Sequence, residues 1–302
     1  MYQKLVVIGS GRVAQRTLEA VLRVPQHPEV VAVEPEAPLT EAFAPACRRH
    51  GIACSRIVDR DALVAFFTAL PEKTLVLSAH NVLIFPPALT DSKRLTIVNF
   101  HNALLPRHRG RNAPSWALYE RDPWVGITWH RVTAGIDEGE VVCQRRIRPT
   151  WDMTALTLTQ ALVDLGIDAL TDLLPELLSR SLRTTPQDTD IAPSFHRASE
   201  VPNCGYLDPG WSFAQASAFL RALDFGKLPL FPQARVRLDE GERQISGYRL
   251  IETGAFSPDP VARRAGDELE FCDADLNLTV SLASAGARSR RRKPVVARGN
   301  SR

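Results

Sequence analysis

The feature that most constrains this chain is the alternation, over its first hundred residues, of short apolar runs with amphipathic stretches. Four runs have the length and composition of buried strands: Lys4–Ile8, Glu29–Val33, Thr74–Leu77 and Leu95–Phe100. Helical spacing lies between them, at Val13–Arg23, Glu41–His50 and Asp61–Leu70. Pro45 delays the start of the second helix, and Asp61 is the expected N-cap of the third. This order predicts an α/β fold with a doubly wound, mostly parallel, Rossmann-like sheet.

Beyond Phe100 the pattern changes, and it predicts where the domains end. We expect a loop over 102–112, a short helix over 113–120, extended segments over 124–132 and 140–148, and a long helix from Thr154 to Leu182. These complete a first domain over 1–182. Residues 183–210 are rich in Pro, Asp, Ser and Thr and predict a linker. A helix at Trp211–Leu223 and glycine-punctuated strands predict a small β-rich domain over 211–286, resembling a partly open barrel.

Charge is distributed unevenly along the chain. The formal net charge is +3, yet residues 287–302 contain seven basic residues and no acid, so the rest of the chain is mildly acidic. We expect 287–302 to be a solvated tail. Residues 200–286 contain eight basic and thirteen acidic residues. This balance disfavours nucleic acid as a partner of the second domain, because a nucleic-acid binder usually has a basic face.

The sequence shows no pattern typical of a membrane-spanning helix or a secretory signal, and its cysteines are scattered. No run of about 18 apolar residues occurs, so no membrane-spanning helix is expected. The N-terminus lacks the features of a signal peptide. Five scattered cysteines form no C-x-x-C pair, which predicts free thiols and no structural zinc site. We therefore expect a cytoplasmic protein, and the oligomeric state stays open, with a dimer among the alternatives.

The densest group of reactive side chains lies in the stretch NFHNALLPRHRGR, residues 99–111. Asn99 and His101 are two residues apart at the end of a predicted strand, so their side chains share a face. The carboxyl ends of parallel strands border the ligand crevice of an open sheet. An amide there can stabilise an oxyanion, and an imidazole can move a proton near neutral pH. Taken alone, the pair is a weak signal and favours a structural asparagine and a histidine whose hydrogen bonds its neighbours satisfy.

This stretch resembles the H-x-S-L-L-P signature of the formyltetrahydrofolate-dependent formyltransferases, which include glycinamide ribonucleotide, methionyl-tRNA and amino-sugar formyltransferases. The matching residues are Asn99, His101, Leu104, Leu105, Pro106 and Arg109-Gly110. Asp137, in AGIDEG, corresponds to the family's aspartate in a glycine-flanked turn, and VGITWH is similar to the family's G-V-T strand. Ala103 departs from the signature, where the family often has serine. The resemblance covers at least residues 70–180, and is looser after 205.

The resemblance implies an N-formyltransferase that uses 10-formyltetrahydrofolate as formyl donor and needs no metal. Asn99 would donate to the oxyanion, and His101 would either stabilise it as imidazolium or relay a proton. Asp137 would orient His101 and raise its pKa through opposite charge. The folate is expected along residues 78–87. Its pterin would contact Leu83, Ile84 and Phe85 on one side and Thr133, Ala134 and Gly135 on the other.

Two other enzyme classes compete with this interpretation. Gly9-Ser10-Gly11 and Ala14 form a G-x-G-x-x-A turn after a strand, and Glu34 follows the second strand, as in a nicotinamide oxidoreductase. The Asn-His-Asp set disfavours that class, because hydride transfer does not need it. A formyltetrahydrofolate deformylase would use a similar set with water as acceptor, but typically has an N-terminal regulatory domain. A catalytically dead binding module is disfavoured by the presence of all three residues.

The identity of the formyl acceptor is the least constrained part of the prediction. The segments RNAPSWAL (111–118) and RALDFG (221–226) resemble formyltransferases of secondary metabolism, which act on aminoacyl groups or amino sugars. We expect a small amine, first an amino acid, free or carrier-tethered, and second a nucleotide-linked amino sugar. Methionyl-tRNA is disfavoured by the charge of residues 200–286. The expected acceptor contacts are Gly9, Ser10, Gly11, Arg107, Arg109, Arg111, Asn112 and Trp116.

Overall fold

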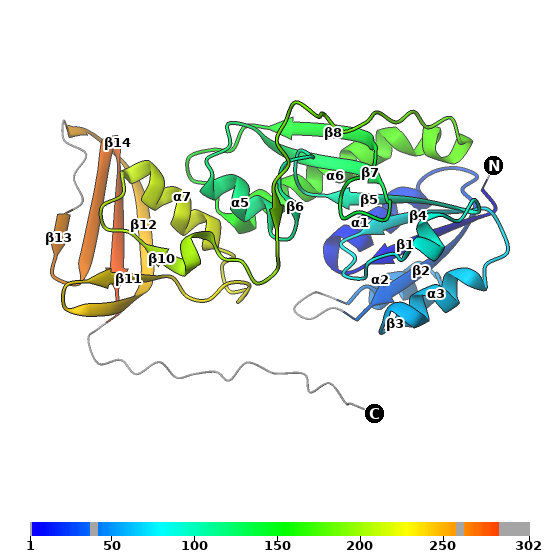
Figure 1. Ribbon diagram of the computed structural model, residues 1–302, viewed down its shortest axis with the longest axis horizontal. Helices are drawn as coiled ribbons and strands as arrows, with labels where there is room; N and C mark the ends of the chain where they lie inside the picture. The colour runs from blue at the N-terminus through cyan, green and yellow to red at the C-terminus, as the bar shows by residue number, and fades with distance from the viewer. Residues whose placement is uncertain (1, 37–41, 258–262, 284–302) are drawn as a thin grey trace. The chain divides into compact units, whose positions relative to one another are not determined.

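The computed structural model describes residues 2–36, 42–257 and 263–283 (Figure 1). The predicted basic tail, 287–302, lies outside these residues. The described chain divides into two compact units. The first comprises the residues up to Cys204 together with Ala218–Pro232. The second comprises Gly205–Ser217 together with the described residues from Gln233 onward.

A seven-stranded sheet with the order β3-β2-β1-β4-β5-β7-β8 forms the centre of the first unit. Its strands are β1 (Lys4–Gly9), β2 (Glu29–Pro35), β3 (Cys54–Ile57), β4 (Thr74–Ala79), β5 (Leu95–His101), β7 (Val125–Arg131) and β8 (Val141–Ile147). The first five are parallel, whereas β7 is antiparallel to β5 and β8 is antiparallel to β7. The predicted doubly wound, mostly parallel sheet is confirmed.

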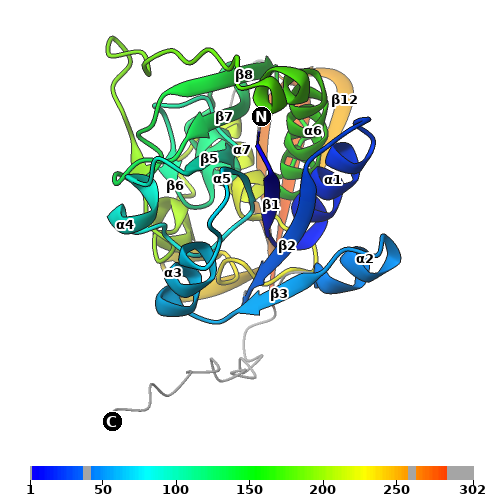
Figure 2. The ribbon, with the colours of Figure 1, turned by 90° about the vertical axis from the view of Figure 1, so that its right-hand side faces the viewer.

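Helices cover both faces of this sheet. They are α1 (Gly11–Leu22), α2 (Ala44–Arg49), α3 (Arg60–Thr68), α4 (Pro87–Thr90), α5 (Ala113–Tyr119) and α6 (Ala155–Ser179). Leu5 and Val7 of β1 belong to the core beneath α1 and α6, whereas Val6 and Ile8 belong to the core beneath α3. Figure 2 shows α1 and α6 on one side of the sheet and α3 and α4 on the other. The central strands are apolar throughout because both of their faces are buried.

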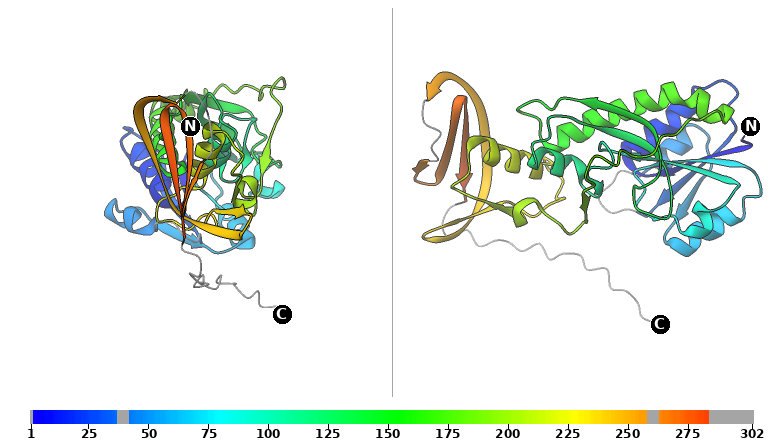
Figure 3. Two further views of the ribbon diagram at one scale, coloured as in Figure 1. Left: turned by 90° about the vertical axis from the view of Figure 1, so that its left-hand side faces the viewer. Right: turned by 45° about the horizontal axis from the view of Figure 1, so that its top comes forward.

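The helix boundaries follow local capping. Thr154 caps α6 through a capping box with Thr157, and the helix continues to Ser179 past Pro175. The right-hand view of Figure 3 shows α6 as one long helix. Helix α2 starts only at Ala44, as Pro45 predicts, because proline fits the first turn of a helix. The prediction that Asp61 caps α3 is wrong. The Asp59 side chain accepts the Ala62 N–H and leaves Asp61 inside the first turn.

Two strands occur where the sequence predicts loop or linker. The short β6 (Arg109–Gly110) lies in the predicted loop after β5, and β9 (Phe195–His196) lies in the predicted linker. They pair in parallel, with Arg109 opposite Phe195 and Gly110 opposite His196. Strand β3 was not predicted either. Such short strands have no periodic pattern, since their hydrogen bonds depend on a distant partner.

The second unit is built on a five-stranded sheet with the order β10-β11-β12-β14-β13. The strands are β10 (Tyr206–Leu207), β11 (Arg235–Leu238), β12 (Gly241–Ser257), β13 (Arg263–Ala265) and β14 (Glu268–Leu282). A 3₁₀ turn, η1 (Pro202–Gly205), and helix α7 (Phe213–Leu223) contain residues of both units. The predicted β-rich C-terminal region is confirmed. Among the described residues, no helix has the length and apolarity needed to cross a membrane.

Candidate active site

Strand β5 places Asn99 and His101 at its carboxyl end. It lies between parallel β4 and antiparallel β7, with Asn99 opposite His130 and His101 opposite Thr128. Their separation of two residues puts both side chains on one face of the sheet, as the sequence predicts. His101 is buried, and Asn99 is half-buried.

The hydrogen bonds of His101 determine which nitrogen is available for chemistry. Nε2 lies 2.8 Å from the backbone oxygen of His108. A carbonyl oxygen only accepts, so Nε2 has the proton and the lone pair of the neutral ring is on Nδ1. Nδ1 lies 3.6 Å from Oδ2 of Asp137. A proton taken up at Nδ1 would therefore be stabilised by the Asp137 carboxylate.

Asp137 lies in the turn between β7 and β8 and has a φ of 54°. Aspartate is among the few non-glycine residues that tolerate this left-handed conformation. Its Oδ2 accepts the Gly110 N–H at 2.9 Å, which links the turn to the loop after β5. Gly139 closes the turn, because a Cβ there would lie 1.8 Å from the Arg131 carbonyl oxygen.

Burial and charge have opposite effects on the pKa values of this pair. Burial lowers the pKa of His101 below its usual value of 6.5, although the Asp137 charge raises it. Asp137 therefore raises the pKa of His101, as the resemblance implies, but desolvation of the imidazolium is larger and the net shift is downward. Burial raises the pKa of Asp137, but His101, His130 and the Gly110 N–H together lower it well below its usual range. A neutral His101 beside a carboxylate is an arrangement suited to accepting a proton.

His130 is a member of the site that sequence reasoning missed. Its Nδ1 donates to the Arg131 backbone oxygen at 2.9 Å, so Nε2 offers a lone pair. Nε2 lies 3.1 Å from Nδ2 of Asn99 and 3.3 Å from Oδ1 of Asp137. One N–H of the Asn99 amide is thereby held, and the other stays available to a substrate oxygen. Only the antiparallel register of β5 and β7, which no local pattern encodes, brings His130 here.

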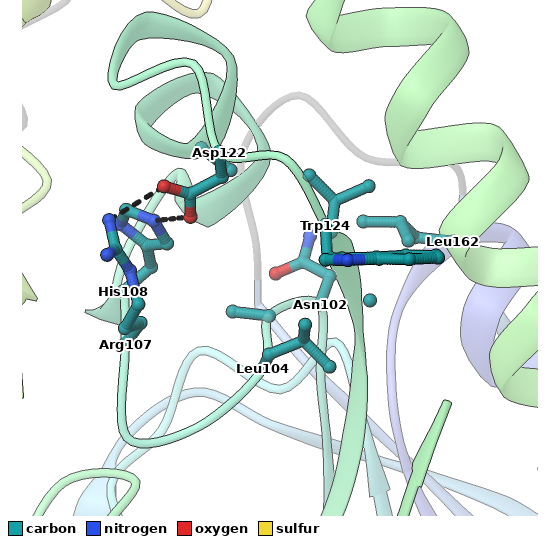
Figure 4. Close-up of a pocket in the computed structure, with 11 residues that line it drawn as sticks. Asn102, Leu104, Arg107, His108, Asp122, Trp124 and Leu162 are labelled. Carbon is teal, nitrogen blue, oxygen red and sulfur yellow. Dashed lines mark hydrogen bonds and ion pairs between the residues drawn. The ribbon is translucent and has the colours of Figure 1, made fainter. Parts of the chain in front are cut away.

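A second histidine cluster includes residues of the loop after β5 itself. The Asp122 carboxylate is 2.8 Å from Nε2 of His108 and accepts from Arg107 at 2.7 Å (Figure 4). Nδ1 of His108 lies 3.0 Å from Nε2 of His196, whose ring stacks on Trp116 with centroids 4.2 Å apart. Burial, and with it the electrostatic interaction with the neighbouring His108 ring, lowers the pKa of His196 to about 4. This cluster supports the backbone carbonyl that binds His101.

Hydrogen bonds, rather than an ion, account for this cluster. The side chains of His108, Glu120 and His196 have possible metal-ligand atoms within 4.8 Å of one another, as a metal site would require. However, the two imidazoles share one N–H···N bond, and Arg107 also bonds Glu120 at 2.7 Å. The adjacent cavity, bordered by Leu104, Trp124 and Leu162, has a volume of about 40 Å³. That space suits water rather than a folate.

The segments predicted to contact the folate follow β4 and β7, the two strands that flank β5 in the sheet. Leu83, after β4, and Val132, after β7, pack against the same hydrophobic core. Ile84 is 64% exposed and Ile136, beside Asp137, is 42% exposed, so each loop presents an apolar side chain to solvent. Phe85 departs from the prediction. Its ring is buried against Phe67 and belongs to the core.

The other residues of the predicted folate contact have mixed exposure. Thr133 and Ala134 are exposed, and Gly135 is half-buried. The turn that contains them leads directly to Asp137. It therefore offers backbone groups beside the reactive residues.

Several of the residues predicted to contact the acceptor also have structural roles. Gly9 packs so tightly against β4 that a Cβ would lie 1.8 Å from the Ala79 oxygen. The buried Ser10 hydroxyl donates to the His80 carbonyl at 3.1 Å. Gly11, at φ 63°, begins helix α1 and is also buried. The sequence pattern could not distinguish this close packing from a ligand contact.

The predicted arginine loop is largely committed to partners within the protein. Arg107 binds Glu120 and Asp122, and Arg109 lies 3.3 Å from Glu138 and donates to Gln187 at 2.7 Å. Arg111 is exposed, and its guanidinium forms no ion pair with any described residue. Asn112 has a left-handed backbone and precedes α5, while Trp116 is half-buried in its stack on His196.

Comparisons with known proteins identify relatives of this chain. The family model described as formyl transferase matches residues 3–174. Methionyl-tRNA formyltransferase of Dichelobacter nodosus is 32% identical over 195 residues, 64% of this chain and 59% of that enzyme. GDP-perosamine N-formyltransferase of Brucella melitensis is 27% identical over 173 residues, 57% of this chain and 64% of that enzyme. The chain thus aligns with about three-fifths of the length of these two relatives.

Solved structures share the fold at low sequence identity. An N-formyltransferase from Helicobacter canadensis, in complex with folinic acid and dTDP-3-aminofucose, has a TM-score of 0.72 at 15% identity, covering 94% of this chain and 100% of that chain. HypX from Aquifex aeolicus, in complex with tetrahydrofolic acid, has a TM-score of 0.61 at 13% identity, covering 93% and 44%. Because the family model matches more than half of its length, this chain belongs to the formyl transferase family.

Proposed function

We propose that this protein transfers the formyl group of 10-formyltetrahydrofolate to the amino group of a small metabolite. The observation that supports this most directly is the convergence of three groups. These are a half-buried amide (Asn99), a buried imidazole with a free Nδ1 (His101) and a carboxylate 3.6 Å from that nitrogen (Asp137).

The donor fits the surface next to these residues. Ile84 and Ile136 expose apolar side chains on the two loops where a pterin is expected. Fold neighbours of this protein bind folinic acid and tetrahydrofolate. When bound, the donor supplies the electrophilic formyl carbon.

Each residue has a distinct task in the transfer. As the amine nitrogen bonds to the formyl carbon, the free N–H of Asn99 donates to the carbonyl oxygen that becomes negatively charged. Nδ1 of His101 accepts the proton that the amine must lose, and Asp137 stabilises the resulting imidazolium. The bond from the carbon to N10 then breaks, and the proton on His101 can pass to the leaving nitrogen. Atoms and charge balance without a metal or oxidant.

For the acceptor we propose an amino acid, free or tethered to a carrier. A nucleotide-linked amino sugar would present two phosphates, yet Arg107 and Arg109 are paired with Asp122, Glu120 and Glu138. Arg111 can bind one carboxylate or phosphate. The amino-sugar alternative is supported by the similarity to GDP-perosamine N-formyltransferase.

Amine dependence tests the reaction. We expect release of tetrahydrofolate, followed by absorbance, to occur only when an acceptor amine is added from a panel of amino acids, aminoacyl carriers and amino-sugar nucleotides. Rapid release without any amine would indicate a deformylase. Formylation of an amino-sugar nucleotide orders of magnitude faster than of any amino acid would refute the acceptor proposal while retaining the reaction.

A further inference from the structure

Residues 185–196, here called the strap, bind both loops that contain the reactive groups. At one end, Thr185 forms an antiparallel bridge with Val141, just after the Asp137 turn. At the other end, β9 pairs with β6 in the loop that follows His101. The strap belongs to the stretch that its composition predicts to be a linker.

Gln187 is the residue of the strap that joins the two loops. Its Nε2 donates to the backbone oxygens of Asp137 and Gly139, at 2.7 and 2.9 Å. Its Oε1 accepts from Arg109 at 2.7 Å. A primary amide offers two donors and an acceptor, so this side chain can make all three bonds at once. The half-buried side chain thereby ties the Asp137 turn to the loop that binds His101.

The far end of the strap holds the backbone around His108. The Ser194 hydroxyl accepts the His108 N–H at 2.8 Å, and the Ser194 carbonyl accepts the Arg109 N–H at 2.9 Å. The carbonyl of His108, between these two bonds, binds Nε2 of His101. His196 adds its bond to the His108 ring. Both partners of His101, the carbonyl and the carboxylate, are thus held from this one segment.

We propose that the strap is the element that positions Asp137 against His101, with Gln187 as its principal positioning residue. This inference rests on the proposed function, because it concerns the same reactive groups. The Gln187 side chain bonds the backbone of Asp137, and its hydrogen bonds to described residues do not include one to His101. It holds the turn so that Oδ2 of Asp137 meets the Gly110 N–H and Nδ1 of His101 together.

Two substitutions separate this role from simple packing. Gln187→Met keeps the shape of the side chain and removes all three hydrogen bonds. Gln187→Glu keeps an acceptor for Arg109 but replaces the two donors with an oxygen that repels the carbonyls of Asp137 and Gly139. Asp188→Asn is the matched control, since it changes the exposed neighbouring residue and leaves these contacts in place.

The Gly110 amide reports the position of Asp137 without any turnover. Its N–H donates to Oδ2 of Asp137, so its hydrogen exchange, measured by NMR on the full chain, follows that contact. We expect exchange to be about tenfold faster in both Gln187 variants and unchanged in Asp188→Asn. We expect kcat for formyl transfer to fall by roughly ten- to a hundredfold, as for a misplaced catalytic group. Thermal melting shows which variants are folded. Ser194→Ala tests the other end of the strap with the same measurements of exchange, kcat and melting.

The two readouts separate failure of the strap from failure of the reaction. Faster Gly110 exchange in a protein that transfers no formyl group would retain the strap and refute the proposed function. Normal exchange and normal kcat in a folded Gln187→Met, beside an active wild type, would refute the strap. The proposal would also be refuted if Gln187→Glu behaved like the wild type while Gln187→Met did not. The bond to Arg109, and not the bonds to the Asp137 turn, would then be the ones that matter.

Discussion

At the scale of single residues, the site depends on which nitrogen of each histidine has the proton. Nε2 of His101 is committed to the His108 carbonyl, and Nδ1 of His130 is committed to the Arg131 carbonyl. These two bonds leave the lone pair of His101 facing Asp137 and that of His130 facing Asn99. Each of the two histidines is therefore oriented by a backbone carbonyl, which can only accept a hydrogen bond.

Removal of either reactive side chain tests this assignment directly. We expect Asn99→Ala and His101→Ala each to lower kcat at least about 100-fold, the usual effect of losing an oxyanion donor or a proton-transfer group. His50→Ala, at an exposed histidine that follows α2, is the control and should keep its kcat. Near-normal rates in both site variants would refute the site. Steady-state kinetics with saturating donor provide the measurement.

The burial of His101 and the charge of Asp137 together predict how kcat/KM depends on pH. His101 must be neutral to accept a proton, so kcat/KM should fall on the acid side with a midpoint below 6.5, because burial lowers the pKa of His101. Asp137 opposes that shift, so Asp137→Asn should move the acid limb to still lower pH while reducing kcat. Glu138→Gln removes the same charge one residue away and should leave the limb in place. An acid limb that moves to higher pH in Asp137→Asn would contradict this assignment.

At the scale of elements, the site is assembled by short connections rather than by the central strands. Strand β5 supplies Asn99 and His101, but the turn between β7 and β8 supplies Asp137, and that turn closes on a glycine. The Gly139 backbone lies against the Arg131 carbonyl with no room for a side chain. The tight packing of this one position sets the path of the chain through Asp137.

Gly139→Ala tests the packing of the turn. We expect it to lower the free energy of unfolding by roughly 1–3 kcal/mol, as for overpacking of a buried position, and to reduce kcat because Asp137 shifts. Gly247→Ala in β12 is the matched control, since a Cβ there would meet no atom within 4 Å. Urea unfolding of the two variants supplies the comparison. Equal stability of Gly139→Ala and wild type would show that the turn can move freely.

At the scale of the whole molecule, the charge of the C-terminal region bears on which formyl acceptor the protein can bind. Residues 200–286, which contain most of the second unit, have eight basic and thirteen acidic residues, although a methionyl-tRNA formyltransferase is among the similar proteins. Binding to a nucleic acid depends on neutralising its phosphates with lysine and arginine. We therefore expect this acidic region not to supply that neutralisation.

The corresponding prediction concerns tRNA. We expect a chain ending at Gly286, which lacks the seven basic residues of 287–302, to produce no salt-dependent shift of initiator tRNA in a gel. The full chain is the comparison, since its basic tail accounts for any weak binding. A shift by the shortened chain that weakens steeply between low and physiological salt would contradict the prediction and favour a tRNA acceptor.

Much of this protein could be predicted from the amino-acid order alone. The alternation of buried runs and helices determined the doubly wound sheet, because apolar periodicity is a local property of the chain. The spacing of Asn99 and His101 determined that they share a face, since side chains alternate along a strand. Pro45 delayed α2 for an equally local reason. Asp137 was found through resemblance to a family motif, and the structure brings it to His101.

Only the tertiary structure decided the rest, and the reason is the same in each case. His130 enters the site through the antiparallel register of β5 and β7, and Gln187 reaches Asp137 across 50 residues of chain. Phe85 is buried in the core, although its place in an apolar loop predicts a contact with the pterin. The net fall in the pKa of His101 follows from burial, which depends on what surrounds the ring in three dimensions. Local propensity determines elements, whereas contacts between distant segments determine proton positions, charge balance and the residues that hold a site in place.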